Sequence, residues 1–266
     1  MIDDVGSSRG SHAPSSLCDL DSKQTTERPS GTGDPLPVEV TAAVIALRDE
    51  QPVVLIRPQS RQADHENSEL PSEQYRASAH VSLEDAIRDR VGSQMGLELG
   101  YVEQLSTDIG LVGTDSALRS SLLPRLSIGY LALIRVEGQA AARTVPWVSC
   151  YDFFPWEDWR SGRPDVLSTL LVPKLQIWAA EETEEERAGK PLSRHDRLKM
   201  TFGVDGGKWD DERIVDRLDI LEEARLLAVA APRRLRSDHS RTLAAALGRL
   251  RAKIRNRPLV FELLPP

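Results

Sequence analysis

The stretch Ser82-Leu-Glu-Asp-Ala-Ile-Arg-Asp-Arg-Val-Gly-Ser-Gln-Met-Gly96 decides the fold of the central part of this 266-residue chain. Its apolar side chains recur every fourth residue between polar positions, at Leu83, Ile87, Val91 and Met95. That spacing predicts an amphipathic helix, because positions four apart share one helix face. Ser82 is the expected N-cap, since its hydroxyl can accept an early backbone N–H, and Gly96 is expected near the helix end.

Strand-like segments lie on both sides of this helix. Residues 40–47 and 53–56 are predicted to form a hairpin, because two β-rich runs are joined there by a short polar connection. A strand is expected over residues 101–107. A longer one is expected over 126–136, where near-continuous apolarity predicts burial on both faces. The pattern indicates an α+β fold.

Composition and cysteine count exclude several classes of protein. Apolar residues make up 40% and charged residues 28%, which is typical of globular proteins. Two cysteines, Cys18 and Cys150, exclude a disulfide scaffold and a cysteine-based zinc site. No apolar run approaches the roughly 18 residues of a membrane span. With acids at Asp3 and Asp4 and no apolar run, the N-terminus argues against a secretory signal, so we expect a cytoplasmic protein without membrane contact.

The net charge of −7 hides an asymmetry along the chain. Residues 233–257 hold nine basic side chains against one acid, Asp238, which gives this segment +8 and leaves −15 for the rest. Such separation predicts an acidic body with a basic face near the C-terminus, and a basic face is a signal of a partner.

Changes in composition suggest three parts. Residues 1–37 are rich in Ser, Gly, Thr, Pro and Asp and are expected to be a disordered tail. A first folded part is predicted over 38–180, ending in a helix that starts or kinks at Pro173. The charged segment 181–191 is the best boundary, and a second part is predicted over 185–266. Within that second part we expect helices over 211–229 and 242–255 and a strand over 259–263.

The order strand, loop, helix, glycine and strand resembles the Nudix fold, an α/β/α sandwich. In the Nudix motif, glutamates on one face of the helix hold Mg²⁺ against a pyrophosphate. With the last motif glycine at Gly96, the Arg-Glu positions hold Asp89 and Arg90, and the Glu-Glu pair falls on Ser93 and Gln94. Since the carboxylates are replaced, we expect no catalytic residue, no metal and no cofactor.

Two alternatives stand beside this interpretation. A displaced magnesium site would use acids elsewhere on the helix, namely Glu84, Asp85 and Asp89. Acids in the first turns of a helix more often complement its dipole, however. The other alternative is an ordinary amphipathic helix in an unrelated α/β domain.

Three further segments indicate which group of Nudix-related proteins this sequence resembles: residues 126–133, 151–160 and 244–265. Together they look like the Nudix-related transcriptional regulators of NAD metabolism, in the bacterial branch described as NAD regulators, over roughly Val38 to Pro266. The resemblance implies a degenerate Nudix domain that senses ADP-ribose or a related NAD-derived nucleotide. It also implies a C-terminal winged-helix domain that binds DNA, and a homodimer. Family members continue with a recognition helix and a wing where this sequence stops, so we expect an incomplete winged-helix region.

The sequence offers three candidate ligand-binding residues. Arg57 ends the second strand and Arg125 precedes the long strand, and both side chains suit bidentate hydrogen bonds to a pyrophosphate. Tyr130 is expected to line the base or ribose site. The alternative is that the arginines are surface residues at strand ends and that the tyrosine belongs to the core.

The basic helix supplies the candidate DNA contacts. Its expected core stripe consists of Leu243, Leu247, Leu250 and Ile254. Basic side chains beside that stripe and just beyond it are predicted to contact phosphates: Arg249, Arg251, Lys253, Arg255 and Arg257. The alternatives are a solvated helix face or a surface that docks an acidic protein.

The sequence therefore predicts a regulator of NAD biosynthesis or salvage whose sensor binds a nucleotide without hydrolysing it. A Nudix pyrophosphatase with a displaced magnesium site is the leading alternative. A non-catalytic interaction module is the third.

Overall fold

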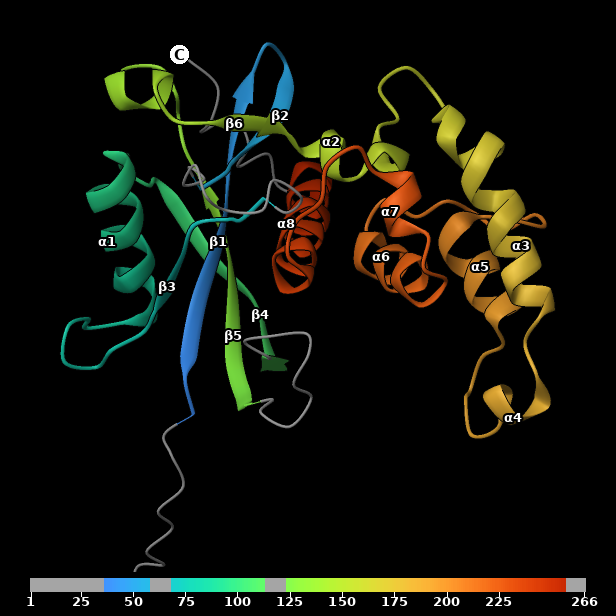
Figure 1. Cartoon of the computed structure of the whole chain (residues 1–266). Helices are drawn as coiled ribbons and strands as arrows, with labels where there is room; N and C mark the ends of the chain where they lie inside the picture. Colours follow the sequence, from blue (N-terminus) through green and yellow to red (C-terminus); the bar gives the residue numbers. More distant parts are fainter. Residues whose placement is uncertain (1–35, 58–67, 113–122, 257–266) are drawn as a thin grey trace, which may run out of the picture. The chain divides into compact units, whose positions relative to one another are not determined.

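The computed structural model describes residues 36–57, 68–112 and 123–256 (Figure 1). The tail expected over 1–37 lies outside these ranges apart from its last two residues. The strand expected over 259–263 also lies outside them.

Within these ranges, a mixed sheet of six strands forms the centre of the fold. The strands run in the order β4-β5-β1-β2-β6, and β3 pairs with β1 beside β2. β1 is parallel to β5 and antiparallel to β2 and β3. The bounds are β1 (Val38–Arg48), β2 (Gln51–Leu55), β3 (Ser72–Gln74), β4 (Tyr101–Val112), β5 (Leu123–Leu133) and β6 (Trp147–Ser149).

The hairpin predicted from the sequence is confirmed as β1 and β2, whose turn places Asp49 and Glu50 at positive φ. The strands predicted at 101–107 and 126–136 correspond to β4 and β5. β1 lies inside the sheet between β5 on one side and β2 and β3 on the other, so it organises the sheet.

The helix predicted at 83–95 is confirmed as α1 (Leu83–Met95). The Ser82 hydroxyl accepts the backbone N–H of Asp85 at 3.0 Å, as expected of an N-cap. Gly96 ends the helix at φ 64°, a left-handed conformation that glycine adopts without steric cost.

Further helices follow β6. They are α2 (Cys150–Phe153), α3 (Val172–Ala180), α4 (Glu184–Arg187), α5 (Arg194–Phe202), α6 (Ile214–Glu223), α7 (Leu227–Ala230) and α8 (Ser237–Asn256). The single helix predicted over 211–229 is wrong. It is divided into α6 and α7 because Arg225 takes φ 57°, through which a right-handed helix cannot continue. The basic helix predicted at 242–255 is confirmed as α8, which begins five residues earlier.

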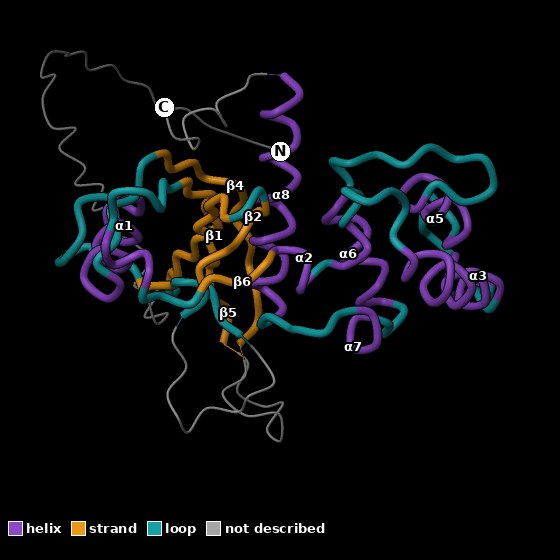
Figure 2. Tube along the Cα trace, turned by 90° about the horizontal axis from the view of Figure 1, so that it is seen from above, coloured by secondary structure: helices purple, strands orange, loops and turns teal. Residues whose placement is uncertain are grey.

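The sheet lies between two helical layers (Figures 1 and 2). Side chains of β1 alternate between the layers, because successive residues of a strand point to opposite faces. Val40, Ala42 and Val44 pack with α1 residues such as Ile87, in one buried cluster. On the other face, Ala43 and Ile45 belong to a second cluster, which includes Leu243 and Leu247 of α8. The predicted α+β class and its α/β/α layering are confirmed.

The second cluster runs on from the sheet into the C-terminal helices. It includes Ala43 of β1, Leu175 of α3, Leu198 of α5, Leu218 of α6 and Leu247 of α8. The division into parts at 38–180 and 185–266 stays a prediction. No helix in the described ranges is both long enough and apolar enough to cross a bilayer.

Candidate functional site

A cavity of about 300 Å³ lies where β1 and β3 pair beside α1. Three arginines from three different elements line it: Arg57 after β2, Arg90 on α1 and Arg125 on β5. The structure thus brings together the two arginines that the sequence proposed for a pyrophosphate. It adds Arg90, which sequence analysis noted only as a departure from the Nudix motif. The other lining residues are Pro37, Val38, Glu39, Ser72, Glu73 and Gln74.

Each of these arginines contacts a carboxylate of this chain. Arg57 Nη1 lies 3.1 Å from Glu69 Oε2, and both side chains are partly exposed. Arg90 Nη1 lies 2.9 Å from Glu73 Oε2 across the gap between α1 and β3. The Arg57–Glu69 pair is an exposed surface pair, worth about 0–1 kcal/mol. The Arg90–Glu73 pair is mostly buried, with 17% and 24% of the two side chains exposed.

Arg125 is the most constrained of the three. Its Nη2 lies 2.6 Å from Asp238 Oδ2 of α8, and its Nη1 contacts Glu39 of β1. Only 18% of its side chain is exposed. Both strand and helix therefore hold this guanidinium at the cavity wall.

Two of the cavity arginines keep a buried donor without a partner. Within the described ranges, the Nε of Arg90 and the Nε of Arg125 are buried and donate no hydrogen bond. A buried donor left unpaired costs about 1–3 kcal/mol, and more when it belongs to a charged group. The cavity thus combines three cations with unused hydrogen-bonding capacity.

Tyr130 does not line this cavity. This residue is 5% exposed and belongs to the apolar cluster beneath α1. Its hydroxyl lies 3.5 Å from Gln104 Oε1. Burial, together with the negative charge of Glu84, raises the pKa of Tyr130. The structure favours the core position that the sequence left open as the alternative.

The residues of α1 do not fit a magnesium site. Ser93 and Gln94, at the Glu-Glu positions of the Nudix motif, are exposed and carry no carboxylate. Glu84 accepts a hydrogen bond from Arg88 at 2.8 Å, one helical turn away. No group of three or more His, Cys, Asp or Glu in the described part of the chain is arranged to hold a metal ion.

The basic helix α8 pairs its charges with acids of this chain. Three of its four expected core residues are buried, namely Leu243, Leu247 and Leu250, whereas Ile254 is 53% exposed and lies outside the core. Of the eight basic residues that the structure describes in the segment 233–257, seven contact a carboxylate: Arg233, Arg236, Arg241, Arg249, Arg251, Lys253 and Arg255. Arg257 lies outside the described residues.

The predicted DNA contacts differ in how tightly they are held. Arg251 Nη1 lies 2.7 Å from the buried carboxylate of Glu157. Lys253 Nζ lies 2.9 Å from Glu103 Oε2 and donates to the Tyr101 hydroxyl at 2.9 Å. Burial alone raises the pKa of Glu103, but the Lys253 ammonium and the Tyr101 hydroxyl outweigh it and hold that pKa below its usual range.

The remaining predicted DNA contacts are looser. Arg249 lies 3.7 Å from Glu103 and is half exposed. Arg255 lies 3.0 Å from Glu212 and is equally exposed. Contact with phosphates stays a prediction, and Arg249 and Arg255 are the most accessible of these side chains.

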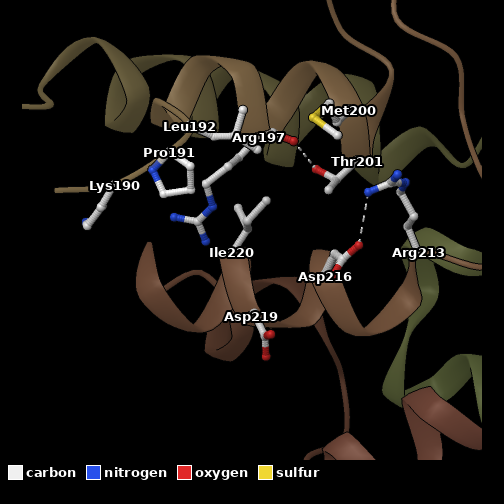
Figure 3. Close-up of a pocket in the computed structure, with 10 residues that line it drawn as sticks. All are labelled: Lys190, Pro191, Leu192, Arg197, Met200, Thr201, Arg213, Asp216, Asp219 and Ile220. Carbon is white, nitrogen blue, oxygen red and sulfur yellow. Dashed lines mark hydrogen bonds and ion pairs between the residues drawn. The ribbon is translucent and has the colours of Figure 1, made fainter. Parts of the chain in front are cut away.

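A second cavity, of about 370 Å³, lies between α5 and α6 (Figure 3). Pro191, Leu192, Met200 and Ile220 give it an apolar lining, and charged side chains surround it. Several of these charges are paired: Arg197 with Glu223 at 2.6 Å, Arg213 with Asp216 at 3.3 Å, and Asp219 with Arg241 of α8. Sequence analysis missed this cavity because its residues form no recognisable motif.

Comparison with known proteins finds partial structural similarity. No protein-family model and no curated protein matches the chain. The crystal structure of Shewanella oneidensis NrtR complexed with a 27mer DNA is 18% identical, with a TM-score of 0.36, and the match covers 54% of this chain and 63% of that one. This chain thus spans less than two thirds of the length of that NrtR chain.

Two more structures illustrate the range of the similarity. The NUDIX domain of the same NrtR, complexed with ADP ribose, is 18% identical with a TM-score of 0.37, covering 57% of this chain and 94% of that one. A MutT/nudix family protein from Enterococcus faecalis is 17% identical with a TM-score of 0.31, covering 44% and 40%. These identities and TM-scores are low, so the comparison assigns this chain to no family.

Proposed function

We propose that this chain is a nucleotide-binding regulator of NAD metabolism, whose arginine cavity binds the pyrophosphate of ADP-ribose or a related nucleotide without hydrolysing it. One observation carries the proposal: Arg57, Arg90 and Arg125 line a single cavity beside α1. The resemblance of the sequence to Nudix-related NAD regulators supplies the ligand class and the biological role.

The chemistry of the cavity suits a pyrophosphate. A guanidinium presents several N–H donors in one plane and matches two oxygens of a phosphate at once. The cavity lies at the lower limit of ordinary ligand pockets, about 300–1,000 Å³. A pyrophosphate and part of a ribose are therefore expected inside, with the rest of the nucleotide outside.

The residues of α1 support binding without turnover. Magnesium-assisted hydrolysis needs carboxylates that hold the ion against the leaving group. Here Arg90 occupies a glutamate position of the motif and instead supplies a cation to the cavity. The same helix that would hold a metal in a hydrolase is thus proposed to hold the anion directly.

DNA contact is the second component of the proposal, and α8 is its proposed surface. Its cations must leave their carboxylate partners to contact phosphates, so we expect weak binding that depends steeply on salt. The resemblance also implies a homodimer, which sedimentation of the purified chain tests directly.

Calorimetric titration of ADP-ribose into the full chain with Mg²⁺ present tests the sensor. We expect saturable heats that return to baseline. Arg90→Gln is expected to weaken binding about tenfold, the equivalent of about 1.4 kcal/mol. Arg88→Gln is the matched control, because Arg88 is on the same helix and pairs with Glu84 away from the cavity.

Two results would overturn the proposal. A sustained heat flow with release of AMP would establish the hydrolase instead. Equal affinities of the Arg90→Gln variant and the parent chain would place the ligand elsewhere.

A further inference from the structure

The cavity arginine Arg125 shares its carboxylate partners with the first turn of α8. Arg236, just before α8, donates through Nη2 to both Glu39 oxygens at 3.1 Å and through Nε to Asp238 Oδ1 at 2.8 Å. Arg125 contacts the same two carboxylates. Two cations and two anions therefore alternate in one cluster that joins β1, β5 and α8.

A second set of contacts fixes the same turn to the strand beside the cavity. His239 is fully buried, and its Nδ1 accepts the backbone N–H of Leu70 at 3.1 Å. Ser68 N donates to the Arg234 carbonyl at 2.8 Å. The segment that leads into β3 and the segment that leads into α8 thus lie side by side at the cavity.

An anion in the cavity changes the charge balance of this cluster. Without ligand, Arg125 and Arg236 face Glu39 and Asp238, and the charges balance. With a pyrophosphate on Arg125, three anionic groups compete for that one guanidinium, and like charges in a partly buried site repel strongly. Each carboxylate keeps two hydrogen bonds from Arg236. Asp238 is the more easily released of the two, because 29% of its side chain is exposed against 13% for Glu39, so water can solvate it.

We propose that a bound pyrophosphate and Asp238 compete for Arg125, so that occupancy of the cavity loosens the first turn of α8. This inference rests on the proposed function and adds its regulation. α8 bears the proposed DNA contacts, so the competition couples the ligand site to the DNA surface. Linkage is reciprocal: whatever removes Asp238 from Arg125 must also tighten ligand binding.

The test compares two isosteric variants on the full chain. Asp238→Asn removes the competing charge. Asp219→Asn is the control, because Asp219 also contacts an arginine of α8, Arg241, but lines the other cavity. Each is titrated with ADP-ribose and with inorganic pyrophosphate. We expect Asp238→Asn to bind about 5-fold more tightly than the parent chain or tighter still, and Asp219→Asn to bind as the parent does.

Amide hydrogen exchange on the unaltered chain gives a readout that needs no variant. Ligand is expected to speed exchange at the first turn of α8, where Ser240 N donates to the Arg236 carbonyl at 2.8 Å. The same increase should be absent in Asp238→Asn, whose turn no longer depends on Arg125.

The outcomes separate this inference from the proposed function. Unchanged affinity in Asp238→Asn, or unchanged exchange on ligand binding, overturns the coupling while leaving the sensor intact. If Asp238→Asn binds pyrophosphate more tightly than the parent chain does, but neither binds ADP-ribose, the coupling is upheld and the nucleotide assignment is overturned. If the parent chain binds neither probe, both are wrong.

Discussion

Helices α1 and α8, which cover opposite faces of the sheet, are held in different ways. α1 is specified by its own sequence, with Ser82 and Gly96 at its ends and an internal pair between Glu84 and Arg88. α8 depends on distant acids, including Glu39 of β1 and Glu157 before α3. A charged segment in a sequence therefore does not translate into a charged surface: most of the +8 segment is neutralised by the fold.

The centre of this long-range network is Glu157. Its carboxylate is fully buried and accepts hydrogen bonds from Arg217 at 2.6 Å and from Arg251 of α8 at 2.7 Å. The buried Arg217 guanidinium also lies 3.9 Å above the Trp209 ring. Removing one member of such a group leaves an uncompensated charge in the interior.

The largest effect should come from Glu157→Gln. We expect it to lower the free energy of unfolding by about 3–5 kcal/mol, because Arg217 and Arg251 lose their common counter-charge. Chemical denaturation measures it. Glu212→Gln, which alters the exposed pair with Arg255, is the control and should cost less than about 1 kcal/mol. Equal costs for the two variants would contradict a network-held α8.

The start of α8 should make stability depend on pH. Burial, and then the positive charge of Arg236, lowers the pKa of His239 from 6.5 to about 3. The unfolded chain binds this proton more readily, so the stability is fully present above pH 6.5 and falls as the pH is lowered toward 3.

For His239 alone, the loss is at most about 1.4 kcal/mol per pH unit. Protonation of Asp238 adds to this loss of stability as the pH falls. Burial tends to raise its pKa, but the hydrogen bonds and charge of Arg236 and the charge of Arg125 hold that pKa below its usual range. The free energy of unfolding, measured by denaturation at several pH values, should change less steeply with pH for His239→Asn. The amide oxygen of that variant can still accept the Leu70 N–H. An unchanged slope would show that His239 is not the titrating group.

A smaller effect is expected at the start of α1. Ser82→Ala removes the N-cap hydrogen bond and should cost about 1 kcal/mol. Ser93→Ala, at an exposed position of the same helix, should change stability by less than about 0.5 kcal/mol. Thermal or chemical denaturation of both variants measures the difference. Similar values for the two would mean that α1, like α8, is held by contacts from elsewhere.

The smallest effect should be found among the cations of α8. Arg249 is half exposed and lies 3.7 Å from Glu103, so Arg249→Gln should change stability by less than about 0.5 kcal/mol. Lys253 is mostly buried and bonds both Glu103 and Tyr101, so Lys253→Gln should cost about 1 kcal/mol. If Arg249→Gln cost more stability than Lys253→Gln, a close contact with Glu103 would not be what stabilises α8.

The distinction between local and long-range contacts also explains which elements could be predicted from the sequence. α1 and the β1–β2 hairpin followed from apolar periodicity and from end or turn residues, which act within a few positions. The break at Arg225 was missed because arginine is not a residue that usually marks a left-handed turn.

The candidate site was only half predictable. Arg57 and Arg125 were proposed because both flank predicted strands. Arg90, which lines the same cavity, was not proposed because it appeared only as a lost glutamate. Tyr130 was proposed as a ligand contact, but its side of β5 faces the core beneath α1. The pairing of α8 was not predictable because Arg236 and Glu39 lie 197 positions apart.

The place of α8 in the sandwich also bears on how the chain is synthesised. The sheet face that α8 covers contains Ala43, Ile45, Leu131 and Leu133, which leave the ribosome long before α8 does. At a synthesis rate of about 5–20 residues per second, that face stays uncovered for on the order of ten seconds before α8 is synthesised. A nascent chain shorter than about Leu250 should therefore bind chaperones that recognise apolar surface, and one that includes α8 should release them.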